Sequence, residues 1–262
     1  MYRAYDRVKE GNPMNSTDTK CTRSTLVIGG SGIVGAAIVR EMCSDGYVVT
    51  FTYASDEEGA RKLASESGAT AVQFRYPEDQ FPVGEYEIVV CTAGVILDKM
   101  SGITADDNAV QQTFTTNAFL PIALAKEYAP TMVDRKWGRF VFVGSIYSFR
   151  VTTNNLAYNG SKHALSGIVR TLALENAPHG ITFNEVCPCA IESKIMDGIA
   201  QQKYLETGVD PSDFLQMVAE NNPTGRMARA KDVSSAVRFL ASDEAEFING
   251  VQLPVDGGQT LE

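Results

Sequence analysis

The chain has 262 residues, 44% of them hydrophobic and 21% charged, so it is long enough and apolar enough to bury a sizeable core. Its formal net charge of −9 argues against nucleic acid as a partner, because binding to phosphates requires clustered lysine and arginine. No apolar run approaches the roughly 18 residues of a membrane span, so no membrane contact is expected.

The N-terminal segment, residues 1–23, is polar and lacks the apolar core of a signal peptide. We expect a flexible extension there, with Met14 as an alternative start. The five cysteines have no paired spacing, and Cys187 and Cys189 stand too close together for a zinc site without further ligands. The sequence therefore predicts a cytoplasmic protein with reduced thiols and no metal.

From residue 24 to residue 262, short apolar runs alternate with longer amphipathic segments. Continuous apolar runs are typical of strands buried on both faces of a parallel sheet. The strands are expected at residues 24–28, 48–53, 71–74, 88–91, 139–143, 182–186 and 251–255. The helices between them are expected at residues 35–45, 56–67, 105–129, 157–177 and 230–241. The alternation predicts a single α/β domain, a doubly wound parallel sheet of about seven strands with right-handed crossovers.

One interval departs from this alternation. Residues 75–87 join the third expected strand to the fourth, and they contain Pro77, Pro82 and Gly84, which disfavour a regular helix. We therefore predict that the helix after the third strand is reduced to a loop.

A glycine-rich turn follows the first strand and opens the first helix. Gly29, Gly32 and Gly35 permit a tight turn and a close approach of main-chain N–H groups to a pyrophosphate at the helix N-terminus. The alternative is a tight turn without a ligand. The cofactor contacts that this turn predicts are Gly29, Ser31, Gly32, Ile33 and Val34.

The end of the second strand bears on which dinucleotide is bound. The strand ends at Tyr53, followed by Ala54 and Ser55, so the carboxylate that would bind a ribose 2′-hydroxyl is absent there. Ser55 and the main chain beyond it suit a phosphate, although Asp56 and Glu57 follow closely. These residues favour NADP(H) over NAD(H).

Three further positions lie at or near strand ends. Ala93 and Gly94 follow the fourth strand and either admit a nucleotide or form a simple strand exit. Ser145 follows the fifth strand, at the edge where open α/β sheets bind ligands, and either contacts a ligand or caps the next turn. Asn117 lies inside a helix pattern although asparagine is a mediocre helix former, so its side chain either faces solvent or bonds internally.

Tyr158 and Lys162 are four residues apart and therefore share one helix face. The lysine ammonium favours the phenolate form of the tyrosine, and Ser145 from a neighbouring strand would hold a carbonyl oxygen beside the phenol. Such groups transfer a proton while a cofactor transfers a hydride.

Taken together, these motifs resemble the short-chain dehydrogenase/reductase family, most closely its 3-oxoacyl-acyl-carrier-protein reductase-like branch, from about residue 24 to the end. The motifs are the glycine turn, Thr92-Ala93-Gly94, Asn117, Ser145, Tyr158 with Lys162, Asn184 through Pro188, and Val255-Asp256-Gly257-Gly258. The resemblance implies a Rossmann-type fold, binding of a nicotinamide dinucleotide, and assembly into a homotetramer or homodimer.

The resemblance also implies residue roles. Tyr158 is the expected general acid in reduction, Lys162 its support and a ribose ligand, Ser145 the ligand of the substrate carbonyl, and Asn117 the anchor of a water in a proton relay. The stretch after the sixth strand should contact the nicotinamide through Pro188, Ile191 and Ser193. Ile33 and Arg75 depart from the family pattern on the adenine side, whereas the catalytic side matches it.

Residues 190–226 correspond to the mobile substrate lid of the family, with helices expected at residues 193–204 and 211–220. These helices either cover a substrate or pack for stability. The substrate contacts expected are Phe149, Arg150, Cys189 and Met196, and Arg150 suits an anionic group.

The sequence thus predicts an NADP(H)-preferring ketoreductase of a small-molecule ketone, either a carrier-bound 3-oxoacyl group or another biosynthetic intermediate. One alternative is the same fold catalysing dehydration or epimerisation of a ketone intermediate. The other is a non-catalytic dinucleotide sensor, which the joint presence of Ser145, Tyr158 and Lys162 argues against, because a sensor needs no general acid.

Overall fold

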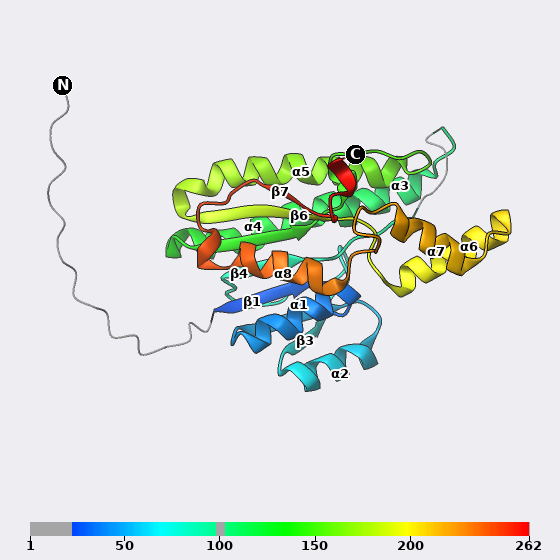
Figure 1. Cartoon of the computed structure of the whole chain (residues 1–262). Coiled ribbons are helices and arrows are strands. Elements are labelled where there is room, and N and C mark those ends of the chain that lie inside the picture. The colour runs from blue at the N-terminus through cyan, green and yellow to red at the C-terminus, as the bar shows by residue number, and fades with distance from the viewer. Residues whose placement is uncertain (1–22, 98–102, 262) are drawn as a thin grey trace, which may run out of the picture.

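The computed structural model describes residues 23–97 and 103–261, so the expected extension at residues 1–23 lies, apart from Arg23, outside the described residues. The described chain contains one sheet of seven parallel strands in the order β3-β2-β1-β4-β5-β6-β7 (Figure 1). The strands are β1 (Ser24–Ile28), β2 (Val48–Tyr53), β3 (Thr70–Gln73), β4 (Ile88–Cys91), β5 (Gly138–Val143), β6 (Ile181–Pro188) and β7 (Gln252–Val255). The predicted doubly wound sheet is confirmed.

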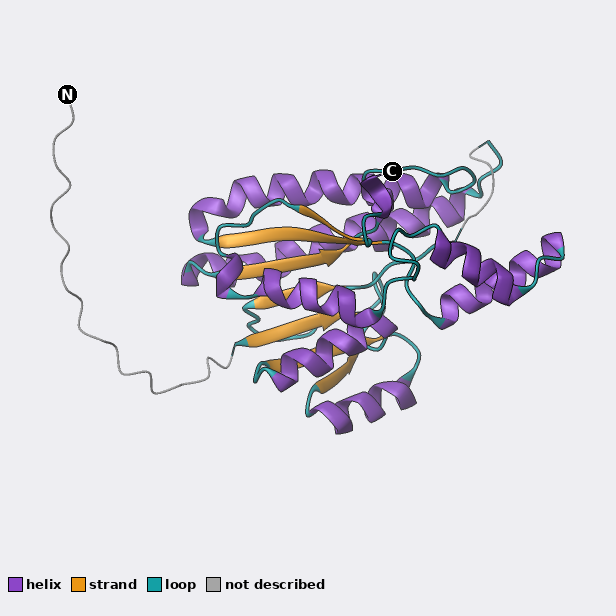
Figure 2. Ribbon diagram, in the orientation of Figure 1, coloured by secondary structure: helices purple, strands orange, loops and turns teal. Residues whose placement is uncertain are grey.

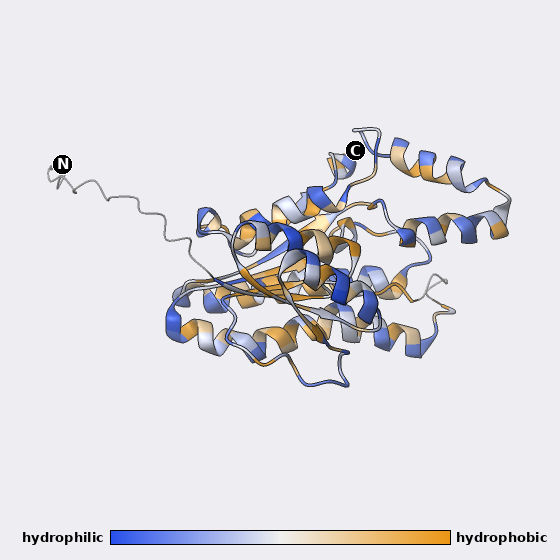
Figure 3. Cartoon of the chain, turned by 90° about the horizontal axis from the view of Figure 1, so that it is seen from below, coloured by the Kyte–Doolittle hydropathy of each residue, from blue (hydrophilic) through white to orange (hydrophobic). Residues whose placement is uncertain are grey.

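Helices cover both faces of the sheet, which gives three layers (Figure 2). Helices α1 (Ile33–Ser44), α2 (Glu57–Ser67) and α8 (Ala230–Ala241) bury Ile38, Leu63 and Val237 on one face. Helices α4 (Leu120–Arg135) and α5 (Leu156–Asn176) bury Leu124 and Val169 on the other. In a view along the vertical axis, apolar residues gather on the sheet and on the helix surfaces that face it (Figure 3). The remaining helices are α3 (Asp107–Phe114), α6 (Lys194–Thr207), α7 (Pro211–Glu220) and short turns at Ile146–Ser148, Ala177–His179, Asp243–Ala245 and Gln259–Leu261.

The prediction of one long helix at residues 105–129 is wrong in two respects. It consists of α3, a π-helical turn at Thr115–Phe119, and α4, and α4 continues through Pro130 to Arg135. Pro130 has no N–H, so it cannot donate the helical hydrogen bond to the carbonyl of Lys126, four residues earlier. Both residues are exposed, so water can hydrate that carbonyl and the helix continues.

The chain between β3 and β4 carries no helix, as predicted. An aromatic cluster occupies this side instead: the rings of Phe74 and Phe81 lie 5.3 Å apart, and Phe81 meets Tyr128 of α4 edge-on at 6.2 Å. The Tyr128 hydroxyl also donates a hydrogen bond to the Pro82 carbonyl at 2.8 Å. Aromatic rings bury large apolar areas, so this loop covers the sheet without a helix.

Helices α6 and α7 project beyond the carboxyl edge of the sheet (Figure 1). Ala200 is the one fully buried residue of these two helices, so they contribute little to the main core. Among the described residues, no helix is long and apolar enough to cross a membrane.

Candidate active site

The candidate site lies at the carboxyl edge of the sheet. The sequence order of the strands reverses between β1 and β4, and open α/β sheets bind ligands at such a reversal. Gly29, Gly94 and Ser145 follow β1, β4 and β5, and Pro188 ends β6. The fold therefore brings most of the predicted site residues to one edge.

The glycine turn after β1 leaves room for main chain but not for side chains. Gly29 has φ +77°, and a Cβ there would lie 2.9 Å from Oγ1 of Thr92. A Cβ on Gly35 would lie 2.3 Å from the carbonyl oxygen of Gly29. Gly32 caps α1, whose first turn offers main-chain N–H groups to an anion. This cradle fits the pyrophosphate of a dinucleotide.

The end of β2 lies beside this turn. Oγ1 of Thr52 accepts a hydrogen bond from the Gly29 N–H at 2.9 Å, which ties the two strand ends together. Tyr53 ends β2, and the first carboxylate after it belongs to Asp56. That carboxylate caps α2 by accepting a bond from the Gly59 N–H at 2.9 Å. The acidic group nearest to the predicted ribose position is therefore engaged by its own helix.

Arg75 has a partner within its own loop. Its Nε and one terminal nitrogen each lie 3.0 Å from a different carboxylate oxygen of Asp79. These bonds lower the pKa of Asp79. The side chain that departs from the family pattern on the adenine side thus stabilises the loop between β3 and β4.

Asn117 is buried within the π-helical turn, so its side chain bonds internally and does not face solvent. Oδ1 accepts from the Val95 N–H at 2.9 Å, and Nδ2 donates to the Val95 carbonyl and to Oγ of Ser161, each at 3.0 Å. A Cβ on Gly94 would lie 3.5 Å from both Asn117 Oδ1 and Nζ of Lys162. Asn117, Gly94 and Lys162 are therefore neighbours, as the predicted site requires.

Tyr158, Lys162 and Ser145 lie where β5 and the N-terminal half of α5 meet. Lys162 is 3% exposed, and its Nζ donates to the Val143 carbonyl at 3.0 Å and lies 5.6 Å from the centre of the Tyr158 ring. Oγ of Ser145 accepts from the Tyr147 N–H at 3.2 Å, which leaves its own proton to donate. One ammonium nitrogen, one phenol and one hydroxyl proton are thus presented at the same strand end.

Two residues near this group were missed in the sequence. Tyr147 packs edge-on against Tyr158, with ring centres 6.1 Å apart. Glu185 lies in the middle of β6, fully buried, and accepts hydrogen bonds from Ser148 and Ser166. The signal for Glu185 was an acidic residue inside an expected buried strand, because unpaired carboxylates are almost never fully buried.

The residues expected to contact substrate are spread more widely. Phe149 is partly exposed, next to the Ser145 turn, and Met196 is half-buried on α6. The Arg150 guanidinium donates to the main-chain carbonyls of Gln259 and Thr260, at 3.3 and 2.9 Å. It therefore holds the C-terminal turn, and its role toward a substrate anion stays a prediction. Cys189 is buried, and burial raises the pKa of its thiol.

Two cavities flank the site. One of about 360 Å³ lies at the base of α7 and is lined by Cys189, Asn222, Arg226 and Asp256. The other, about 440 Å³, lies at the start of α5 and is lined mainly by apolar surface of the stretch from Val151 to His163. Ser145 and Tyr158 line neither of these two cavities.

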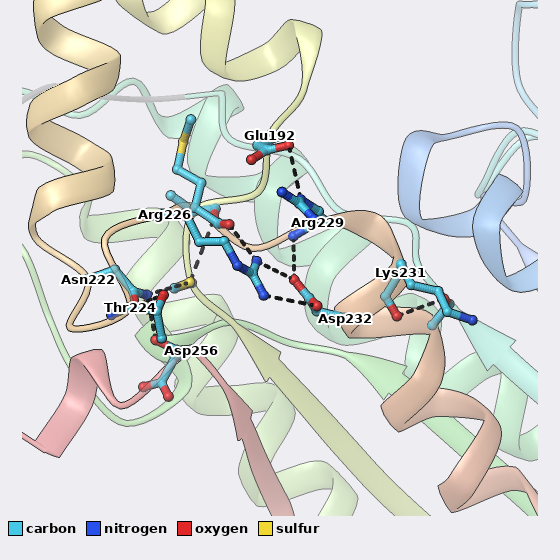
Figure 4. Close-up of polar contacts among 12 residues, drawn as sticks. Glu192, Asn222, Thr224, Arg226, Arg229, Lys231, Asp232 and Asp256 are labelled. Carbon is cyan, nitrogen blue, oxygen red and sulfur yellow. Dashed lines mark hydrogen bonds and ion pairs between the residues drawn. The ribbon is translucent and has the colours of Figure 1, made fainter.

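The two ends of the α6–α7 segment are joined to each other. Ile191 and Ala228 form an isolated parallel bridge, and Arg226 makes two bonds to the carboxylate of Asp232, one of them at 3.2 Å and the other at 2.6 Å (Figure 4). Asn222 donates to the Asp256 carbonyl at 2.6 Å. Ser193 caps α6 by accepting from the Met196 N–H. The segment therefore leaves and rejoins the fold at one place.

Known proteins resemble this chain in sequence and in fold. A family model described as enoyl-(acyl carrier protein) reductase matches residues 29–260. The cyclic-di-GMP-binding biofilm dispersal mediator protein of Escherichia coli (strain K12) is 32% identical over 246 residues, covering 90% of this chain and 96% of that protein. The acetoacetyl-CoA reductase of Shinella zoogloeoides is 30% identical over 250 residues, covering 91% and 98%. A solved variant of the actinorhodin polyketide ketoreductase has the same fold, with a TM-score of 0.84, 23% identity and coverage of 92% and 98%.

Proposed function

Because the chain belongs to the short-chain dehydrogenase/reductase family, whose members bind a nicotinamide dinucleotide, we propose that it is an NADP(H)-preferring ketoreductase. In this proposal it reduces a ketone to a secondary alcohol. The observation that carries the proposal is the position of the buried Lys162 ammonium, which bonds the Val143 carbonyl at the end of β5 at 3.0 Å and lies 5.6 Å from the centre of the Tyr158 ring.

We assign the residue roles from their hydrogen bonds. Ser145 donates its free proton to the substrate carbonyl, because its oxygen already accepts from a main-chain N–H. Tyr158 donates a proton to the same oxygen, and the bound dinucleotide supplies the hydride. Lys162 uses one of its three donors on Val143, which leaves two for the ribose and for a water. Asn117, whose two amide protons are engaged, accepts from that water and completes a relay toward Lys162.

The remaining assignments concern the ends of the cofactor and the substrate. Gly29, Ser31, Gly32, Ile33 and Val34 hold the pyrophosphate, and Ala93 and Gly94 lie against the nucleotide. Pro188, Ile191 and Ser193 contact the nicotinamide. The α6–α7 segment serves as the substrate lid, with Met196, Cys189 and Phe149 toward the substrate.

A ketone panel tests the proposed reaction. Purified protein is mixed with NADPH and either acetoacetyl-CoA, ethyl acetoacetate or cyclohexanone, and NADPH absorbance is followed. We expect oxidation of NADPH with at least one ketone and none with crotonyl-CoA, whose reduction the description of the matching family model would suggest. Reduction of crotonyl-CoA alone would contradict ketone reduction, and inertness toward every compound together with dinucleotide binding would favour the sensor.

The cofactor preference is a separate prediction. The residues that follow β2 before Asp56 carry no carboxylate, and the Asp56 carboxylate is engaged at the start of α2. We therefore expect NADPH to bind more tightly than NADH in a fluorescence titration. Replacing Ser55 by aspartate places a carboxylate at this position and should reverse the order, whereas tighter NADH binding by the unaltered chain would overturn the preference.

We also propose that the chain assembles into a homotetramer or homodimer through α4 and α5. Large apolar side chains are exposed on these helices and on the turn that precedes α4. They are Phe119, Ile122, Leu156 and Leu174. Exposed apolar surface of this kind is typical of a protein–protein interface.

A further inference from the structure

The fully buried carboxylate of Glu185 lies behind the proposed catalytic group and is not used by the proposed reaction. We propose that Glu185 is a positioning residue, which holds the turn carrying Ser145 against the helix carrying Tyr158 and Lys162. This inference rests on the proposed function, since it assigns how that group is held in place.

The first link runs from Glu185 to the serine turn. Oγ of Ser148 donates to Oε1 of Glu185 at 2.5 Å and accepts from the Ser145 N–H at 3.2 Å. One hydroxyl thus joins the carboxylate to the main chain of Ser145. A charge-assisted bond of this length is stronger than a neutral one, so it restrains the Ser145 turn.

The second link runs from Glu185 to α5. Oγ of Ser166 donates to Oε2 of Glu185 at 2.7 Å, and Ser166 lies one helical turn after Lys162. Nε2 of Gln252, on β7, donates to the same Ser166 oxygen at 2.7 Å. Each serine oxygen accepts one N–H and turns its own proton toward the carboxylate, so the network is suited to the ionised form of Glu185.

The main chain also makes room for this carboxylate. A Cβ on Gly144, immediately before Ser145, would lie 1.9 Å from Oε1 of Glu185. Any other residue at position 144 would therefore push the carboxylate away from the serine turn. Gly144, Ser148 and Ser166 together surround the Glu185 carboxylate.

Burying the charged carboxylate of Glu185 lowers the stability of the folded state. Burial raises the pKa of Glu185, while Ser148, Ser166, the Lys162 ammonium and the Cys187 thiol, in decreasing order, act in the opposite direction. Lys162 and Cys187 are the titratable groups that act on this carboxyl group, and burial raises the pKa of Cys187 as well. A raised folded-state pKa means that folding stability falls as the pH rises through that pKa. A neutral group of the same shape should therefore be more stable at alkaline pH.

The test variant is Glu185→Gln, which keeps the shape and removes the charge. We expect kcat for the fastest ketone of the panel to fall between about 10- and 100-fold, as small misplacements of catalytic groups do, with KM unchanged. At pH 8 the Tm of the variant should equal or exceed that of the parent chain. Glu175→Gln, which removes an exposed carboxylate on α5, should change neither quantity.

The pH dependence separates positioning from general stability. The parent chain gains the charge on Glu185 as the pH rises through the raised folded-state pKa, while the variant stays neutral. The difference in Tm and the ratio of the two kcat values should therefore both be smallest at low pH and grow as the pH rises. A loss of Tm that parallels the loss of kcat would assign Glu185 a structural role and overturn the proposal, as would unchanged kcat.

A second variant tests the route. Ser148→Ala removes the bond between Glu185 and the Ser145 turn, and we expect its loss of kcat to be non-additive with that of Glu185→Gln. Additive losses would contradict the route through Ser148. If the parent chain reduces no ketone, the proposed function fails. The positioning role of Glu185 can still be tested by measuring amide hydrogen exchange in a peptide spanning residues 144–150. Faster exchange in Glu185→Gln than in Glu175→Gln supports it, and equal exchange overturns it.

Discussion

Replacing Tyr158 by phenylalanine is expected to lower ketone turnover by about 10²- to 10⁴-fold, the usual contribution of a positioned general acid. The ring and its edge-on contact with Tyr147 persist in this variant, so the loss concerns one hydroxyl group. NADPH binding, measured by fluorescence titration, should stay as in the parent chain, because Lys162 keeps its bond to Val143.

Tyr128→Phe is the matched control for this prediction, because it removes the same hydroxyl from a tyrosine on α4. Its hydroxyl donates a buried hydrogen bond to Pro82, worth about 1 kcal/mol. The loss should lower Tm by roughly 2–4 °C in a domain of this size without affecting turnover. Full activity of Tyr158→Phe would refute the assigned acid, whereas equal losses in both variants would indicate a general effect on folding.

Gly35→Ala is expected to disrupt the cofactor cradle and destabilise the fold. The new Cβ would lie 2.3 Å from the Gly29 carbonyl oxygen and 2.7 Å from Cα of Gly30, both main-chain atoms that cannot rotate away. Overpacking costs about 1–3 kcal/mol, and a main-chain obstacle places this variant near the upper value. We expect Tm to fall by roughly 6–12 °C, from 2–4 °C per kcal/mol.

The same change should weaken NADPH binding. Displacing the Gly29 carbonyl moves the turn that receives the pyrophosphate, and each 1.4 kcal/mol lost from binding raises Kd about tenfold. Gly198→Ala on α6 is the control, because a Cβ there meets nothing within 4 Å. Its Tm and its Kd for NADPH should match those of the parent chain or improve slightly. A Gly35→Ala protein with unchanged Kd would show that the dinucleotide does not use this turn.

The fold could be predicted because its signals are local. Buried parallel strands appear as continuous apolar runs, and the two prolines and glycine of residues 75–87 exclude a helix there. The spacing of Tyr158 and Lys162 likewise follows from the helical repeat. The ends of most elements differ from prediction by a few residues, because helix and strand termini depend on caps and neighbours.

The sequence did not indicate hydrogen-bond partners that lie far along the chain. The π-helical turn places Asn117 against Val95 and Ser161. Arg150 binds carbonyls more than 100 residues away at the C-terminal turn. Periodicity and local motifs carry no information on such partners.

In the proposed function, in which the α6–α7 segment is the substrate lid, the bridge between Ile191 and Ala228 separates substrate choice from proton transfer. Because both ends of the α6–α7 segment meet at one point, the whole segment is an excursion from a continuous sheet. We expect that a segment of different length or sequence can replace it without moving Ser145, Tyr158 and Lys162. Replacing the α6–α7 segment with the corresponding segment of a relative should thus change the range of ketones that the protein reduces, while the proton-transfer residues stay in place.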